Sequence, residues 1–82
     1  MKIWRATIEV LHETNNLAVM HGDSFLLHQI ATRMGWMHEC ARGCNIMARV
    51  LGALDRDPGP LKRVMTKGAR GRWVRCFRMP EE

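Results

Sequence analysis

The sequence predicts a small, mostly helical α+β domain that ends in a β-hairpin, and three observations support this fold class. The chain has 82 residues, of which 46% are hydrophobic, so it can form one modest core. Apolar residues recur at helical spacing through the middle of the chain. After residues 57–60, where two prolines and a glycine end any helix, the pattern changes to two short strands. We therefore expect one domain spanning residues 1–82.

The first 14 residues fit either a helix or a strand. Trp4, Ile8 and Leu11 recur at helical spacing, but apolar and polar residues also alternate between positions 4 and 10. A helix is slightly favoured because the fold described below needs a third helix. The two asparagines at 15–16 then form a turn before a short strand at 17–20.

A helix is predicted over residues 25–34. Ser24 is a suitable N-cap, and Gly35 occupies the position where a left-handed residue ends a helix. The loop 21–24 separates this helix from the preceding strand. The side chains expected on its buried side are Phe25, Leu26, Leu27, Ile30, Ala31 and Met34.

A second, longer helix is predicted from His38 to Arg56. Its apolar side consists of Cys40, Cys44, Met47, Leu51 and Leu54, with Ala41 and Ala48 beside them.

The hairpin is predicted from strands 61–66 and 72–79, joined by the glycine-containing connection 67–71. Trp73 and Phe77 are expected to close the core over the helices. Stacking of a nucleic-acid base on Trp73 is the alternative.

Positive charge is concentrated in the second half of the chain. The net charge is +5, and residues 62–78 contain seven basic and no acidic residues. Such asymmetry favours a polyanionic partner, with nucleic acid ahead of an anionic membrane. A solvated basic surface without a partner is the alternative.

The order of helix, short strand, helix, turn, helix and hairpin resembles a winged helix-turn-helix domain. Within the segment 29–36, Ala31 and Gly35 match the small residue and the turn glycine of that family. The resemblance is best over residues 25–79. It departs from the family pattern at Ala41 and Cys44, where branched aliphatic residues are usual. The resemblance implies binding of double-stranded DNA by a small transcriptional regulator of phage or bacterial type.

The outer side of the helix predicted over 38–56 supplies the candidate base contacts. Its polar residues share one side at about 100° per residue. Arg and Asn can bond bidentately to guanine and adenine in the major groove. The residues predicted to contact bases are Arg42, Asn45, His38 and Arg49. A solvated helix face is the alternative interpretation.

The hairpin, or wing, supplies the candidate contacts to phosphates or the minor groove. The residues predicted for wing or phosphate contacts are Lys67, Arg70, Arg72, Arg56, Lys62 and Arg63.

Other classes of protein fit the sequence less well. Cys40, Cys44 and Cys76 are expected to be free thiols rather than zinc ligands, because they lack a typical knuckle spacing. No nucleophile–base pair or phosphate-binding loop is recognisable, so we expect neither an enzyme nor a cofactor. Without an apolar run of about 18 residues or a secretory signal, a cytoplasmic protein without membrane contact is expected.

Two alternatives concern the partner. A small phage-type inhibitor or adaptor of the anti-CRISPR kind could use the same fold to bind an acidic protein or a nucleoprotein complex. A homodimer is also possible, with Trp4, Ile8 and Leu11 as the seam.

Overall fold

The computed structural model describes residues 1–38, 43 and 45–81, and it is an α+β domain as predicted. The helices are α1 (Ile3–Glu13), α2 (Ser24–Met34) and α3 (Ile46–Arg56). The strands are β1 (Ala18–Met20), β2 (Lys62–Lys67) and β3 (Trp73–Arg78), and a 3₁₀ turn, η1 (Ala69–Gly71), joins β2 to β3. The segment whose pattern was ambiguous, at the N-terminus, is therefore helical.

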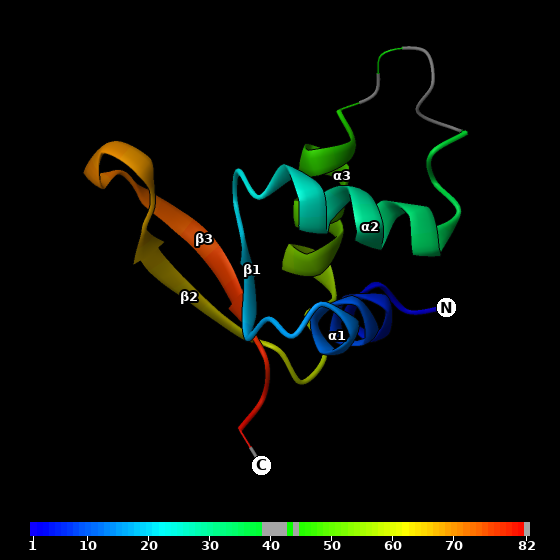
Figure 1. Cartoon of the computed structure of the whole chain (residues 1–82), viewed down its shortest axis with the longest axis horizontal. Coiled ribbons are helices and arrows are strands. Elements are labelled where there is room, and N and C mark those ends of the chain that lie inside the picture. The colour runs from blue at the N-terminus through cyan, green and yellow to red at the C-terminus, as the bar shows by residue number, and fades with distance from the viewer. Residues whose placement is uncertain (39–42, 44, 82) are drawn as a thin grey trace.

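The three strands form one antiparallel sheet in the order β1-β3-β2. Phe77 in the central strand pairs with Val19 on one side and Arg63 on the other. Because β1 is only three residues long, it covers only the C-terminal half of β3. The rest of the β2–β3 hairpin projects away from the helices (Figure 1).

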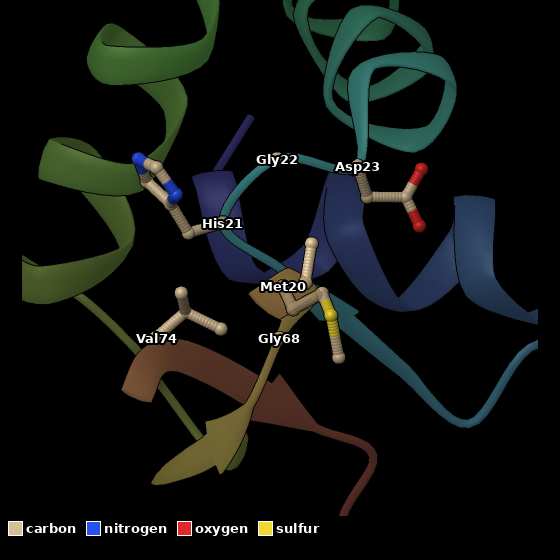
Figure 2. Close-up of a pocket in the computed structure, with 7 residues that line it drawn as sticks. Met20, His21, Gly22, Asp23, Gly68 and Val74 are labelled. Atoms are coloured by element: carbon tan, nitrogen blue, oxygen red, sulfur yellow. The ribbon is translucent and has the colours of Figure 1, made fainter. Parts of the chain in front are cut away.

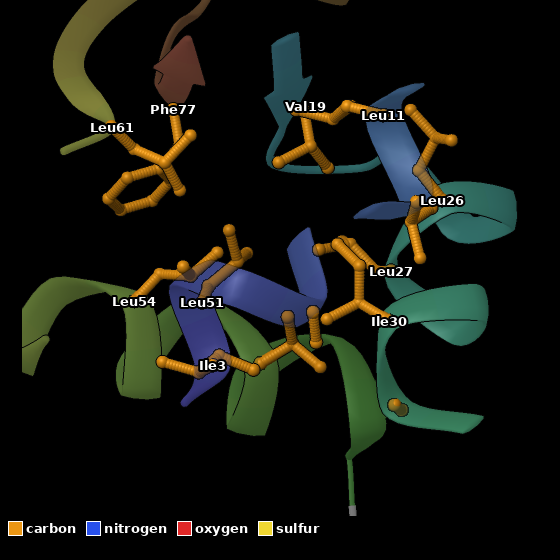
Figure 3. Close-up of a cluster of buried hydrophobic side chains, with 14 of the residues drawn as sticks. Ile3, Leu11, Val19, Leu26, Leu27, Ile30, Leu51, Leu54, Leu61 and Phe77 are labelled. Atoms are coloured by element: carbon orange, nitrogen blue, oxygen red, sulfur yellow. The ribbon is translucent and has the colours of Figure 1, made fainter. Parts of the chain in front are cut away.

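The core lies where the three helices meet one end of the sheet (Figure 3). Leu11, Leu27, Leu54 and Phe77 are fully or almost fully buried there. Burying such side chains stabilises a fold by about 1.5–3 kcal/mol each relative to leaving them exposed. Phe77 is the strand residue that fixes the hairpin to this core.

Local signals explain the limits of α2. The side chain of Asp23, rather than that of Ser24, accepts a hydrogen bond from the Leu26 N–H at 3.2 Å, so Asp23 is the N-cap. Gly35 ends the helix in the left-handed conformation, at φ +79°, as predicted.

The prediction that a helix begins at His38 is wrong. His38 lies in a turn, Gly43 has φ +104° and α3 begins at Ile46. Asn45 is extended and caps the helix, because its Oδ1 accepts a hydrogen bond from the Ala48 N–H at 3.1 Å. The predicted core residues Cys40, Ala41 and Cys44 lie outside the described residues.

Three side chains predicted to be buried are instead exposed. Phe25 is 65% exposed, because it lies almost opposite the side of α2 that carries Leu27 and Ile30. Ala48 is exposed on the outer side of α3. Trp73 is 60% exposed, because it is the first residue of β3, at the end of the hairpin that projects away from the helices.

None of the helices found among the described residues is long and apolar enough to cross a membrane.

Gly59 is expected to be a sensitive position in the fold. It has φ +55°, and a Cβ atom there would lie 2.3 Å from the Trp4 ring. Gly59→Ala should therefore combine left-handed strain of about 1–3 kcal/mol with overpacking of about the same size. Urea unfolding measures the free energy of unfolding.

Gly35→Ala is the matched control, since it has φ +79° but nothing within 4 Å of the added methyl group. Equal losses of stability in the two variants would contradict the close contact between Gly59 and Trp4.

Candidate nucleic-acid interface

The tip of the hairpin presents basic side chains on a tight turn. Arg70 and Gly71 both have positive φ, at +61° and +71°, and Arg70 and Arg72 are exposed. Lys67 precedes the turn, and its ammonium lies 5.4 Å from the centre of the Trp73 ring, within cation–π range. The predicted wing residues Lys67, Arg70 and Arg72 are therefore brought together at one end of the molecule (Figure 1).

The described carboxylates are engaged elsewhere. Glu9 and Glu13 pair with Arg33, whose pKa they raise through hydrogen bonding and charge. The others that form ion pairs are Asp55, Asp57 and Glu81, and Asp23 caps α2. Within the part of the chain that the structure describes, no carboxylate contacts the three cations of the hairpin tip.

The outer side of α3 adds two arginines to this basic surface. Arg49 lies over the Trp36 ring, with its guanidinium carbon 4.1 Å from the ring centre. Arg56 is exposed, and its guanidinium lies 3.5 Å from the position of a Cβ on Gly52. Arg49 and Arg56 are seven residues apart and therefore share one side of the helix. Gly52, which carries no side chain, lies between them on that side.

The predicted stripe of base-contacting residues is only partly present. His38 is not in α3, and Asn45 uses its side chain to cap the helix, so neither continues the side that carries Arg49. Arg42 lies outside the described residues. The helix was predicted too long because cysteines and alanines before position 45 have helical spacing.

Asp55 joins α3 to the hairpin. Its Oδ1 lies 3.0 Å from the Nε of Arg63, and its Oδ2 pairs with the guanidinium of Arg75. Its side chain is 23% exposed, so these pairs are less screened than those on the open surface. Arg63, predicted as a phosphate contact, is paired with this carboxylate, and its side chain is 55% exposed.

Lys62, another predicted phosphate contact, is paired more weakly. Its ammonium lies 3.6 Å from Glu81, and both side chains are more than half exposed. Such exposed pairs contribute little, so Lys62 remains accessible to solvent and to anions.

A shallow pocket lies between the loop after β1 and the start of η1 (Figure 2). Met20, Gly68 and Val74 are among its lining residues. His21 and Asp23 also line it, but their side chains point away from each other, so they form no acid–base pair.

Cys76 lies on the outer side of the sheet and is 3% exposed. Burial raises the pKa of its thiol, although Arg78 opposes this shift. No group of three metal-ligating residues occurs among the residues with described positions. The other two cysteines are not among them.

The three residues predicted as a dimer seam are not all accessible to a second copy of the chain. Leu11 is fully buried in the core of its own chain. Trp4 and Ile8 also pack against that core and are only partly exposed.

Two features of the site were missed by the sequence reasoning. The contact between Asp55 and the arginines of the sheet joins residues that are distant along the chain, and no local pattern indicates it. The stacking of Arg49 on Trp36 depends on the path of the chain between α2 and α3. The acidic residues just before the basic hairpin, Asp55 and Asp57, are the sequence signal for the first, and they do not show which of them contacts the sheet.

Comparison with family models, curated proteins and solved structures finds no match to the chain.

Asn45→Ala is expected to destabilise the protein by about 1 kcal/mol, because the N–H of Ala48 loses its acceptor. Asn45→Ser keeps an N-cap oxygen and should retain most of the stability. Thermal unfolding followed by circular dichroism compares the variants. Equal destabilisation by serine and alanine would contradict the capping role.

Asp55→Asn is expected to lower the free energy of unfolding by about 1–2 kcal/mol, because Arg75 loses a charged hydrogen-bond acceptor and Arg63 loses a close counter-charge. Asp57→Asn is the matched control near the end of the same helix. Its contact with Lys2 is 3.9 Å long and more exposed, so its removal should change stability by less than about 0.5 kcal/mol. Chemical denaturation at low salt distinguishes the two, and equal effects would refute a special role for Asp55.

Proposed function

We propose that the chain binds double-stranded DNA as a small winged helix-turn-helix regulator. The hairpin tip supplies contacts to phosphates or the minor groove, and the outer side of α3 enters the major groove. Phosphate contacts provide most of the affinity, and a few side chains on the helix provide the preference for sequence.

The observation that carries the proposal is the cluster formed by Lys67, Arg70 and Arg72. The three cations lie at the end of a projecting hairpin, and in the described part of the chain no carboxylate neutralises them. Like charges held together in this way raise the local electrostatic potential, which attracts a polyanion. Tight turning at Arg70 and Gly71 keeps this tip narrow.

The arrangement of the elements supports the same proposal. The order of helix, short strand, helix, helix and C-terminal hairpin agrees with the layout that the sequence resemblance implies. Asp55 faces the hairpin, and the next residue, Arg56, lies on the exposed side of α3. The C-terminal end of α3 therefore lies beside the base of the hairpin. In this proposal one duplex contacts the exposed side of α3 and the hairpin tip.

The small side chains of α3 favour close approach to a groove. Ala48, beside Arg49, and Gly52, between Arg49 and Arg56, add little side-chain bulk to this part of the helix. In this proposal Arg49 is oriented by Trp36, which reduces the entropy that a base contact would otherwise lose.

The test is fluorescence anisotropy of the chain with a labelled mixed-sequence duplex at several salt concentrations. Binding should weaken steeply with salt because phosphate contacts release counterions. Arg70→Ala should weaken binding to every duplex and reduce the slope of log K against log salt by about one.

Arg5→Ala is the control, because Arg5 is an exposed arginine on α1, far from the hairpin tip. It should leave the slope unchanged. Absence of binding at low salt would refute the proposal and would favour an inhibitor that binds an acidic protein. An equal fall in slope for Arg5→Ala would show diffuse charge rather than a wing contact.

A further inference from the structure

Trp73 is the most exposed tryptophan of the chain. Its side chain is 60% exposed, whereas Trp4 and Trp36 are packed against the core. A large aromatic surface left in water loses the favourable free energy of burial and commonly marks an interaction site. Neither the groove contacts nor the phosphate contacts of the proposed function require this ring.

The ring lies among groups that suit a nucleotide. Lys67 is its direct partner across the hairpin, with its ammonium 5.4 Å from the ring centre. Beside the ring is a shallow, largely apolar pocket lined by His21, Met65, Val74 and Arg75. The surroundings thus combine an open aromatic surface, apolar contacts and positive charge without a carboxylate in the pocket lining.

We propose that Trp73 and this pocket hold one unpaired nucleobase of a DNA strand, stacked on the indole. The phosphates next to that base contact Lys67 and the arginines of the hairpin tip. This inference rests on the proposed DNA binding and adds a separate site for a base outside the duplex stack.

The occupant follows from the shape and charge of the site. Within an intact duplex, the faces of the bases are covered by neighbouring bases, and only their edges are open in the grooves. Stacking on an indole therefore requires a base that is bulged, flipped or single-stranded. Positive charge beside the ring favours a base carrying phosphate over an uncharged aromatic ligand.

The test compares three labelled DNA probes of one sequence: a perfect duplex, the duplex with one extra thymine, and the duplex with an abasic residue in place of that thymine. The abasic probe has the same bent and flexible backbone but no base. The full chain should bind the thymine bulge about tenfold more tightly than the abasic bulge. Stacking of one base on the indole is the source of this preference.

Substitutions then assign the preference to the ring. Trp73→Leu keeps an apolar side chain and should abolish the difference between the two bulged probes. Its affinity for the perfect duplex and its salt slope should change little, because no charge is removed. Trp73→Phe keeps an aromatic face and should retain part of the preference. Phe25→Leu removes an equally exposed aromatic side chain on α2 and should change nothing.

The other outcomes separate this inference from the proposed function. Equal binding of the thymine and abasic probes by the full chain, or a preference that survives in Trp73→Leu, would overturn it while leaving the proposed function intact. An equal loss in Phe25→Leu would overturn it too. Trp73-dependent binding of the thymine bulge without binding of the perfect duplex would refute the proposed function but support this site. Absence of binding to all three probes would refute both.

Discussion

The burial of Phe77 is the contact on which the arrangement of the hairpin depends. Its ring is fully buried between the helices and the sheet, and its strand neighbours are Val19 and Arg63. Beyond the residues that pair with β1, the β2–β3 hairpin projects away from the helices. The exposure of Trp73, four residues before Phe77, is a consequence of this anchoring.

The base and the tip of the hairpin differ in how their positive charges are paired. At the base of the hairpin, Asp55 pairs with Arg63 and Arg75 and ties the sheet to α3. At the tip, Arg70 and Arg72 have no such partner among the residues of known position. Positive charge at the base is therefore partly neutralised by Asp55, while the tip keeps the charge that a polyanion can neutralise.

Much of the fold could be predicted from the sequence. Helical periodicity, the glycine after α2 and the prolines after α3 gave the order of the elements, because these signals act within a few residues. The predicted start of α3 was wrong. Apolar residues keep a helical spacing before position 45, but the side chain of Asn45 caps the helix, which begins at Ile46. The burial of Trp73 was wrong as well, because residue type and alternation do not reveal how far a hairpin projects.

Sequence spacing predicted which basic residues gather at the hairpin tip, but it did not predict how the hairpin and α3 lie relative to each other. The clustering of Lys67, Arg70 and Arg72 follows from their places around one turn, so sequence spacing was sufficient. The pairing of Arg63 with Asp55 required knowledge of how α3 lies on the sheet. Base contacts were assigned from a helix that was too long, so only Arg49 remains on the helical side that the proposal uses.

Amide chemical shifts of the ¹⁵N-labelled chain, recorded while an unlabelled duplex is added at low salt, test the central claim most directly. If α3 and the hairpin form one DNA-binding surface, the shifts should change together around Arg49, Gly52 and Arg56 and across the turn from Lys67 to Arg72. The amides of α1 should stay unchanged. Changes confined to α1, or spectra unaffected by the duplex, would contradict the account.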